Sequence, residues 1–245
     1  MSGHSQFKNI MYRKGAQDAR RAKVFSKISR EITVAVKESG TDPESNTRLR
    51  SALLSARSEN MPKDNVDRAI KKALGGETGA DYQSVRYEGY GPGGVAIIVE
   101  GLTDNKNRTA PDVRSAFLKF GGSLGEANSV SFQFDRVGYV LYEKKAASEE
   151  AMFETAIEVG ADDLFATDEF FEITCLRENL SSLRDALIKK FGDPKEAKVV
   201  WKPKNFVAVD TDTAKTLLKL IETLEDNDDV QSVIANYELP EGFSL

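Results

Sequence analysis

The chain has 245 residues with a formal net charge of −5, 40% hydrophobic and 30% charged residues, a balance typical of a protein with a packed core. Its one cysteine (Cys175) and one histidine (His4) exclude a disulfide framework, cysteine-based metal sites and motifs that need two histidines. The first ten residues lack the apolar stretch of a secretory signal, and the longest aliphatic run, Val95–Val99, is far shorter than a membrane span of roughly 20 residues. We therefore expect a cytoplasmic protein without membrane contact, bound metal or cofactor.

The charge is unevenly distributed along the chain. Residues 1–76 carry 16 Lys and Arg against 8 Asp and Glu, a net charge of +8. Residues 77–245 carry the remaining 18 Lys and Arg against 31 Asp and Glu, a net charge of −13, so that the two parts add to −5. This asymmetry indicates contact with nucleic acid or another polyanion through the basic part. The alternative is that the basic helices dock on an acidic neighbour or stay solvated.

Basic and aromatic residues are interleaved near the start of the chain, an arrangement that suits phosphate contact together with base stacking. Phe7 and Tyr12 lie among His4, Lys8, Arg13, Lys14, Arg20, Arg21 and Lys23. The alternative is that Phe7 and Ile10 hold this arm on the helices that follow, with its charges solvated.

Residues 17–39 are predicted to form an amphipathic helix that Gly40 ends. Its apolar residues recur at three- and four-residue spacing: Val24, Phe25, Ile28, Ile32, Ala35 and Val36. Beside them runs a basic stripe: Arg20, Lys23, Lys27 and Arg30. Like charges at this spacing repel one another, so the stripe is better explained if an anion meets it. The candidate nucleic-acid-binding residues are therefore Lys8, Arg13, Lys14, Arg20, Arg21, Lys23, Lys27 and Arg30.

Two further helices follow, and three helices with small apolar faces should pack into one bundle. Asn46 is expected to cap the first, which the Asn60-Met61-Pro62 segment ends. Its apolar face is Leu49, Ala52, Leu53 and Ala56. The apolar face of the second, which ends at Gly75-Gly76, is Val66, Ala69, Ile70, Ala73 and Leu74. This last helix adds positive charge through Lys63, Arg68, Lys71 and Lys72.

Beyond Gly79, short strands and helices alternate. Strands are expected over 95–99, 129–134, 139–142, 170–176, 198–202, 206–209 and 232–237. Helices are expected over 111–120, with Thr109 as its N-cap, and over 149–159, 180–191 and 213–224. Units this short favour small α+β sandwiches over one large doubly wound sheet.

No motif in the chain predicts catalysis. The glycines of 89–94 fit a dinucleotide-binding pattern in spacing, but a strand follows them and Pro92 lacks a backbone donor, so we interpret them as a turn. Residues 104–107 resemble the start of a calcium loop but lack the later ligands, so we interpret them as a polar turn, with a nucleic-acid contact through Lys106 and Arg108 as the alternative. Cys175 is interpreted as a core residue within a strand, with no expected pairing to His4. The acidic doublets of residues 162–229 are interpreted as solvated surface.

Many segments of the chain resemble the YebC/PmpR family. In the basic part they are Gly3-His4-Ser5, Asn9-Ile10, Arg13-Lys14, Gln17-Asp18-Ala19-Arg20, Arg30-Glu31-Ile32, Asp42-Pro43, Arg48-Leu49-Arg50 and Asn60-Met61-Pro62-Lys63-Asp64-Asn65. Further on they are Tyr87-Glu88-Gly89-Tyr90-Gly91-Pro92-Gly93-Gly94, Thr103-Asp104-Asn105 and Gly121-Gly122-Ser123-Leu124-Gly125. The chain departs from the family at Gln6-Phe7 and Met11-Tyr12, where Lys-Trp and Lys-His are usual, so two positive charges and a histidine are missing.

The resemblance implies three domains, the third inserted in the second. Combined with the predicted elements, the expected fold is α+β: a basic helical domain (1–79) and two small α/β sandwiches of the ferredoxin-like kind (80–134 with 205–245, and 135–204). Bacterial family members are described as transcriptional regulators, and a mitochondrial relative as a translational activator of cytochrome c oxidase. The resemblance thus implies a non-enzymatic, DNA-binding regulator of transcription. Two alternatives stay open: a translation factor that binds RNA or the ribosome, and a protein-interaction module.

Overall fold

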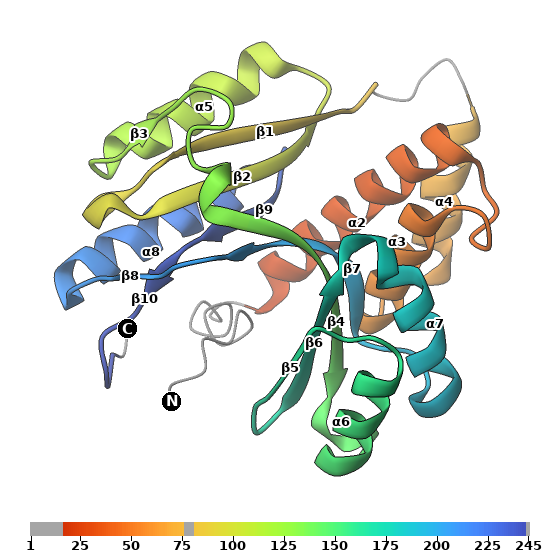
Figure 1. The fold of residues 1–245 in the computed structure, drawn as a ribbon. Coiled ribbons are helices and arrows are strands. Elements are labelled where there is room, and N and C mark those ends of the chain that lie inside the picture. The colour runs from red at the N-terminus through yellow and green to blue at the C-terminus, as the bar shows by residue number, and fades with distance from the viewer. Residues whose placement is uncertain (1–16, 76–80, 244–245) are drawn as a thin grey trace. The chain divides into compact units, whose positions relative to one another are not determined.

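The computed structural model describes residues 17–75 and 81–243, with side chains from residue 21 onward (Figure 1). These residues form seven α-helices and ten strands, the strands lying in three sheets, so the fold is α+β as predicted. They fall into two compact units. The first unit contains residues 28–75 and 136–201, and the second contains residues 17–27, 81–135 and 202–243.

The N-terminal part is helical, as predicted: α2 (Gln17–Ser39), α3 (Thr47–Ser58) and α4 (Lys63–Leu74). Gly40 ends α2 with a φ of 82°, a conformation that favours glycine, while its N–H donates to the Val36 carbonyl. Asn46 caps α3 by accepting from the Leu49 N–H at 2.9 Å. Its amide nitrogen also donates to the carbonyls of Ala35 and Gly40, each at 2.8 Å. The cap therefore fixes the angle at which α3 leaves α2.

The apolar faces of these helices are close to those predicted, with one difference in α3 and one in α4, where Leu74 is 66% exposed. The buried residues that follow the prediction are Ile28, Ile32, Ala35, Val36, Leu49, Ala52, Ala56 and Ala69. Leu54 is buried in α3, whereas Leu53, which we expected in its place, is only half-buried. Leu54 packs into the core of the α/β part of the first unit, a contact that no pattern local to α3 could indicate.

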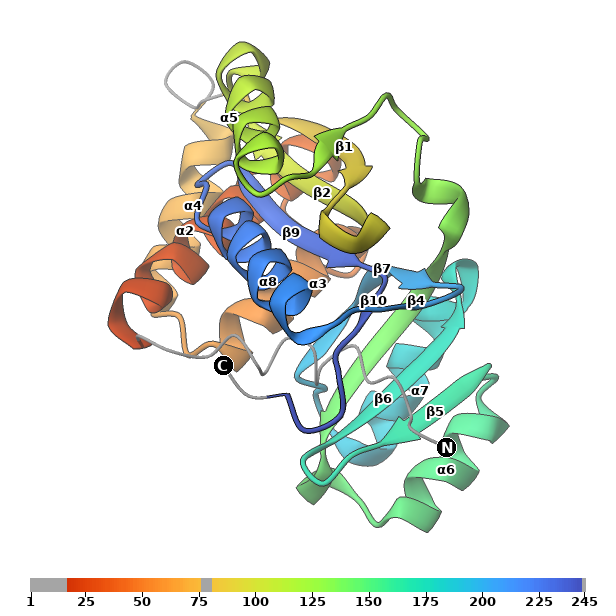
Figure 2. The same ribbon diagram turned by 90° about the vertical axis from the view of Figure 1, so that its left-hand side faces the viewer.

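The α/β part of the first unit is a four-stranded sheet covered by two helices (Figure 2). Along the chain it runs β4 (Phe134–Glu143), α6 (Glu149–Glu158), β5 (Asp163–Ala166), β6 (Phe170–Leu176), α7 (Leu180–Phe191) and β7 (Glu196–Pro203), and the sheet order is β5-β6-β4-β7. The core between sheet and helices includes Val140, Ile173, Met152 and Leu183. Cys175 is fully buried there, as predicted, and burial raises the pKa of its thiol to about 11.

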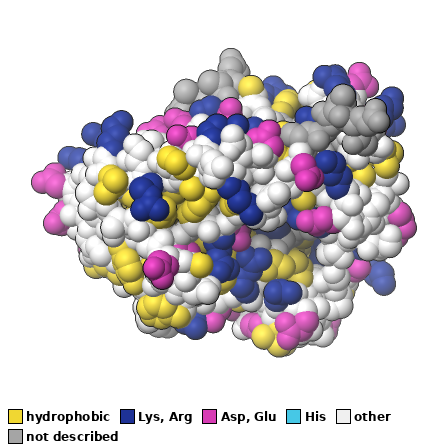
Figure 3. Space-filling view, turned by 90° about the horizontal axis from the view of Figure 1, so that it is seen from above, with side chains coloured by type: hydrophobic (Ala, Val, Ile, Leu, Met, Phe, Trp, Pro, Cys, Tyr) yellow, Lys and Arg dark blue, Asp and Glu magenta, His cyan; other side chains and the backbone are white. Residues whose placement is uncertain are grey.

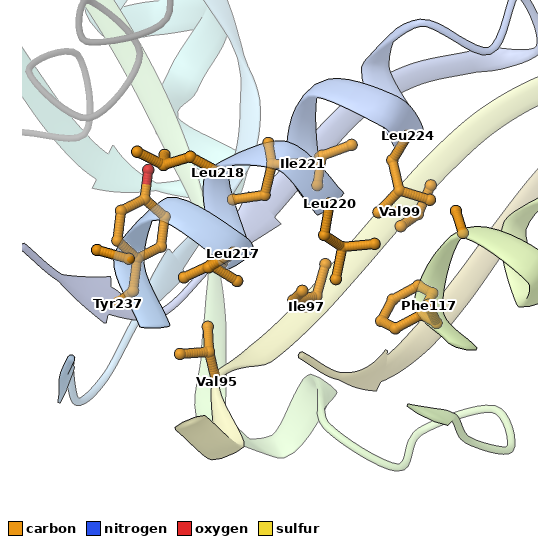
Figure 4. Close-up of a cluster of buried hydrophobic side chains, with 14 of the residues drawn as sticks. Val95, Ile97, Val99, Phe117, Leu217, Leu218, Leu220, Ile221, Leu224 and Tyr237 are labelled. Carbon is orange, nitrogen blue, oxygen red and sulfur yellow. The ribbon is translucent and has the colours of Figure 1, made fainter. Parts of the chain in front are cut away.

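The second unit also pairs a four-stranded sheet with two helices. The sheet order is β3 (Ser123–Leu124), β1 (Gln83–Tyr90), β2 (Ala96–Thr103) and β9 (Val230–Ala235), and neighbours in this order are antiparallel. The helices are α5 (Lys106–Lys119) and α8 (Thr211–Glu225), and a parallel pair of short strands, β8 (Val207–Ala208) and β10 (Tyr237–Glu238), completes the unit. Leu217, Leu220 and Leu224 of α8 belong to one buried cluster, in which Leu217 lies toward Val95, Leu220 toward Ile97 and Leu224 toward Val99 (Figure 4).

The glycine-rich segment 89–94 connects β1 to β2, and a strand follows it, as the turn interpretation predicts. Gly93 and Gly94 have φ values of 73° and 74°, which favour glycine. A side chain at Gly89 would collide with the Ser123 carbonyl and lie 2.9 Å from the Phe117 ring. The glycines of this segment therefore allow a turn and permit backbone and side chains to approach closely.

Glu88, in the same segment, organises a loop some 40 residues further along the chain. Its side chain is fully buried and accepts hydrogen bonds from the N–H groups of Val130 (2.9 Å) and Ser131 (2.8 Å). Its second carboxylate oxygen lies 2.9 Å from Nε of Arg86. Burial alone would raise the pKa of Glu88, but the hydrogen bonds from Val130, Ser131 and Asn128 and the charge of Arg86 together lower it.

This loop contradicts the strand expected over 129–134. Residues 131–133 form a short 3-10 helix, and β4 begins only at Phe134, because the backbone N–H groups of Val130 and Ser131 are bound to a carboxylate and not to a strand. The N-cap of α5 also differs from the prediction. Asn105 fills this position, accepting from the Arg108 N–H at 3.2 Å, so that Pro111 lies inside the helix.

Thr109, which we expected as the cap, lies buried inside α5. Its hydroxyl is 2.7 Å from the carboxylate of Asp229, which also accepts from Thr103 and Arg108. Asp229 is therefore buried, and its interpretation as solvated surface was wrong, because its donors lie about 120 residues earlier in the chain. Strands β1 and β5 were not predicted, because their sequences alternate only weakly between apolar and polar residues.

Candidate nucleic-acid interface

Of the eight candidate residues, four have side chains that the structure describes: Arg21, Lys23, Lys27 and Arg30. Lys8, Arg13 and Lys14 and the side chain of Arg20 lie outside the described residues. The four described cations all lie on α2, where the helical spacing of the sequence placed them.

Lys23 and Lys27 contact the C-terminal end of α8. Nζ of Lys23 lies 2.6 Å from a carboxylate oxygen of Asp226, and Nζ of Lys27 donates to the carbonyl of Glu225 at 3.1 Å. A helix C-terminus carries partial negative charge, which attracts both ammonium groups. Burial lowers the pKa of Lys27, and the nearby charge of Glu225 opposes this effect only in part. These two lysines thus have acidic partners within the chain, as the docking alternative of the sequence analysis describes.

Arg21 and Arg30 differ in exposure. Arg21 is exposed, and its guanidinium carbon lies 5.5 Å from the centre of the Phe25 ring. This cation–π contact holds the planar group along the helix while its N–H donors stay accessible to a phosphate. Arg30 is half-buried.

The arginines of α3 form ion pairs within the first unit. Arg48 binds Glu31 (2.6 Å) and Glu38 (2.8 Å). Burial alone would lower the pKa of Arg48, but hydrogen bonds to these two glutamates raise it. Arg50 pairs with Asp185 at 3.2 Å and Arg57 with Asp193 at 2.6 Å. The polar side of α3 therefore joins the helices to the α/β part of the unit.

Helix α4 carries exposed cations within the basic part of the chain. Lys63, Arg68 and Lys71 are exposed, and none of them forms an ion pair within the part of the chain that the structure describes. Lys71 and Lys72 lie in the last helical turn, where the helix dipole also favours positive charge. These cations were expected to add positive charge but were not predicted as binding residues. The sequence did indicate them, because Arg68, Lys71 and Lys72 fall within five residues.

Acidic and basic side chains are interspersed over the face of the molecule shown in Figure 3. Binding of a polyanion would depend on the cations of individual elements, such as Lys63, Arg68 and Lys71 of α4.

Two further kinds of feature are absent from the described residues. They contain no group of three or more His, Cys, Asp and Glu side chains arranged to hold a metal ion. The helices that the structure describes include none that is long and apolar enough to cross a membrane.

Comparison with known proteins gives two family matches that together cover most of the chain. Residues 5–76 match the model of the TACO1/YebC protein N-terminal domain, and residues 82–237 match that of the TACO1/YebC second and third domain. Among solved structures, a conserved hypothetical protein from Aquifex aeolicus is similar, with 46% sequence identity and a TM-score of 0.86. This match covers 93% of the present chain and 95% of the other.

Proposed function

Because the chain belongs to the TACO1/YebC family, we propose that it is a non-enzymatic regulator of gene expression that binds nucleic acid through its basic N-terminal helices. The observation that carries this proposal is the exposed set of cations on α4 that have no ion-pair partner among the described residues. Phosphate groups would satisfy this set at little structural cost, because no internal contact has to break.

We propose two separate sets of phosphate-binding cations. The first is Lys63, Arg68 and Lys71 of α4, and the second is the set of candidate residues predicted from the sequence: Lys8, Arg13, Lys14, Arg20, Arg21, Lys23, Lys27 and Arg30. Lys23 and Lys27 can bind phosphate only after leaving the end of α8, so we expect them to contribute less than the cations of α4.

We also propose that the chain has three domains: residues 1–79, residues 80–134 with 205–245, and residues 135–204. The βαββαβ order from β4 to β7 and its β5-β6-β4-β7 sheet support a ferredoxin-like sandwich for the inserted domain. The net charge of −13 on residues 77–245 repels nucleic acid from the two α/β domains. This repulsion would restrict binding to the helical domain.

The salt dependence of binding tests the interface. Each phosphate contact steepens the fall of log K with log salt by about 0.9 for duplex DNA. Replacing Lys63, Arg68 and Lys71 by Gln should therefore reduce the slope by about 2.7, and the loss of affinity between 50 and 200 mM salt should be about 40-fold smaller.

A matched control removes three exposed lysines of the acidic part, Lys189, Lys215 and Lys219, which form no ion pair with described residues. We expect its slope to equal that of the unmodified chain. An unchanged slope in the α4 variant, or an equal reduction in both variants, would contradict the proposed interface.

A second measurement distinguishes the two targets. We propose DNA as the target, with the ribosome or its RNA as the alternative that the mitochondrial relative suggests. The fraction of the protein captured on chromatin should exceed the fraction that co-sediments with ribosomes at equal salt. The α4 variant should show less capture on chromatin than the unmodified chain. The reverse ranking would identify a translation factor. Retention of a protein partner after nuclease digestion, with neither nucleic-acid interaction, would identify an interaction module.

A further inference from the structure

The outer side of α6 carries two exposed apolar side chains. On the inner side of this helix, Met152, Thr155 and Ala156 are buried against the sheet, and the opposite side is turned outward (Figure 2). Phe153 and Ile157, one turn apart on the outer side, are 51% and 60% exposed. The helix thus has a second apolar surface besides the one that fills the core.

Three glutamates flank this apolar pair at four-residue spacing: Glu150, Glu154 and Glu158. All three are exposed, and none forms an ion pair within the described part of the chain. Like charges four residues apart repel one another on a helix, and Glu158 lies at the C-terminal end, where the helix dipole disfavours negative charge. Glu149 differs, because it pairs with Lys144 at 2.9 Å. Since α6 has no basic residue, nothing within the helix offsets the repulsion.

We propose that the α6 face, formed by Glu150, Phe153, Glu154, Ile157 and Glu158, binds a basic amphipathic helix of a protein partner. Leucine-like side chains of such a helix would cover the two apolar residues, and its lysines or arginines would pair with the glutamates. The same carboxylates repel nucleic acid and anionic lipid surfaces, which favours a cationic protein segment as the occupant.

This inference goes beyond the proposed nucleic-acid binding and does not depend on it, because the α6 face shares no residue with the proposed interface. The ten residues of α6 extend over about 15 Å, enough for about three turns of a partner helix. A contact of this size is small for a stable complex. We therefore expect a transient complex that weakens as salt screens the glutamates.

A synthetic peptide of about 14 residues tests the proposal, with leucines on one helical face and lysines on the other. A second peptide of the same composition in scrambled order has no apolar face. The full-length protein should bind the amphipathic peptide at least tenfold more tightly than the scrambled one. Either the double change Phe153→Ser with Ile157→Ser or the triple change of the three glutamates to Gln should weaken this binding at least tenfold.

Two control variants carry the same kinds of change elsewhere. Leu118→Ser with Phe132→Ser removes other exposed apolar side chains, and Asp112→Asn with Glu126→Gln and Glu222→Gln removes other exposed carboxylates. Both should bind the peptide normally. All altered residues are exposed, so circular dichroism should show every variant folded.

Three results would overturn the proposal. The first is equal binding of the two peptides, which would mean simple charge attraction. The second is equal loss in the control variants. The third is occupation of the α6 face by the chain itself, seen as a dimer that the α6 variants dissociate or as peptide binding that tightens when residues 1–16 are removed.

Discussion

Removing the carboxylate of Glu88 should destabilise the second unit by a predictable amount. In the Glu88→Ala variant the N–H groups of Val130 and Ser131 lose their acceptor, and Val130 is fully buried. Leaving a buried donor unpaired costs about 1–3 kcal/mol, and two N–H groups are affected here, whereas the side chain of Arg86 is 36% exposed and can regain water. We therefore expect the free energy of unfolding to fall by about 2–4 kcal/mol.

The Glu88→Gln variant should lose less stability than Glu88→Ala. Its amide oxygen can still accept from the two N–H groups, but its NH2 then faces the guanidinium of Arg86, donor against donor. We expect a loss of about 1–3 kcal/mol, because hydrogen bonds to charged groups contribute more than neutral ones. Glu126→Ala, an exposed change in the same loop, should alter stability by less than about 0.5 kcal/mol.

The assay is urea unfolding followed by circular dichroism, with amide hydrogen exchange at Val130 and Ser131 to localise the effect. Exchange is needed because a chain with two compact units need not unfold in one step. A Glu88→Ala variant within 1 kcal/mol of the unmodified chain would refute the reasoning, as would unchanged exchange at these two amides.

The pH dependence gives a second check on Glu88. Its pKa in the folded chain is lower than its ordinary value of 4.5, so its stabilisation is fully present above that pH. The stabilisation is lost as the pH falls through the folded-state pKa. The stability difference between the unmodified chain and Glu88→Gln should hence be constant from neutral pH to about pH 5 and shrink below. A difference that widens in acid would contradict this account.

Three further predictions concern packing and reactivity. Gly89→Ala should lower stability by about 1–3 kcal/mol or more in thermal unfolding, because its Cβ would collide with the Ser123 carbonyl, whereas Gly75→Ala, which meets only ordinary contacts, should not. Leu220→Ala should cost about 2–5 kcal/mol in urea unfolding because this side chain is fully buried, while Leu74→Ala, at 66% exposure, should cost less than about 0.5 kcal/mol. Cys175 should react with iodoacetamide at pH 8 only after the protein unfolds. In the folded protein its pKa of about 11 leaves about one thiol in a thousand ionised at this pH, and rapid reaction of the folded protein would contradict its burial.

Local sequence patterns predicted the elements that carry strong local signals. Helix α2 begins and ends where the apolar spacing and Gly40 placed it, and the limits of β6 and α7 also match. These elements have apolar periodicity, caps and stops within a few residues of one another. The strand expected over 129–134 was wrong because the carboxylate that holds this segment comes from Glu88, far away in the sequence.

The candidate interface shows the same division between local and distant causes. The basic stripe of α2 could be read from its spacing, but the partners of Lys23 and Lys27 lie about 200 residues away at the end of α8. The exposed cations of α4 were visible in the sequence. The sequence did not show that they differ from the arginines of α3, which are bound to Glu31, Asp185 and Asp193 in the structure.

The sequence by itself determined the helices of the basic part, the opposite net charges of the two parts of the chain and the likeness to a family. These properties depend on composition and on neighbours within one or two turns. The tertiary structure alone decided which charges are paired and which face of α6 stays apolar and exposed. The physical reason is that an ion pair or a buried contact requires two groups within a few ångströms, and folding brings together residues that no local pattern connects.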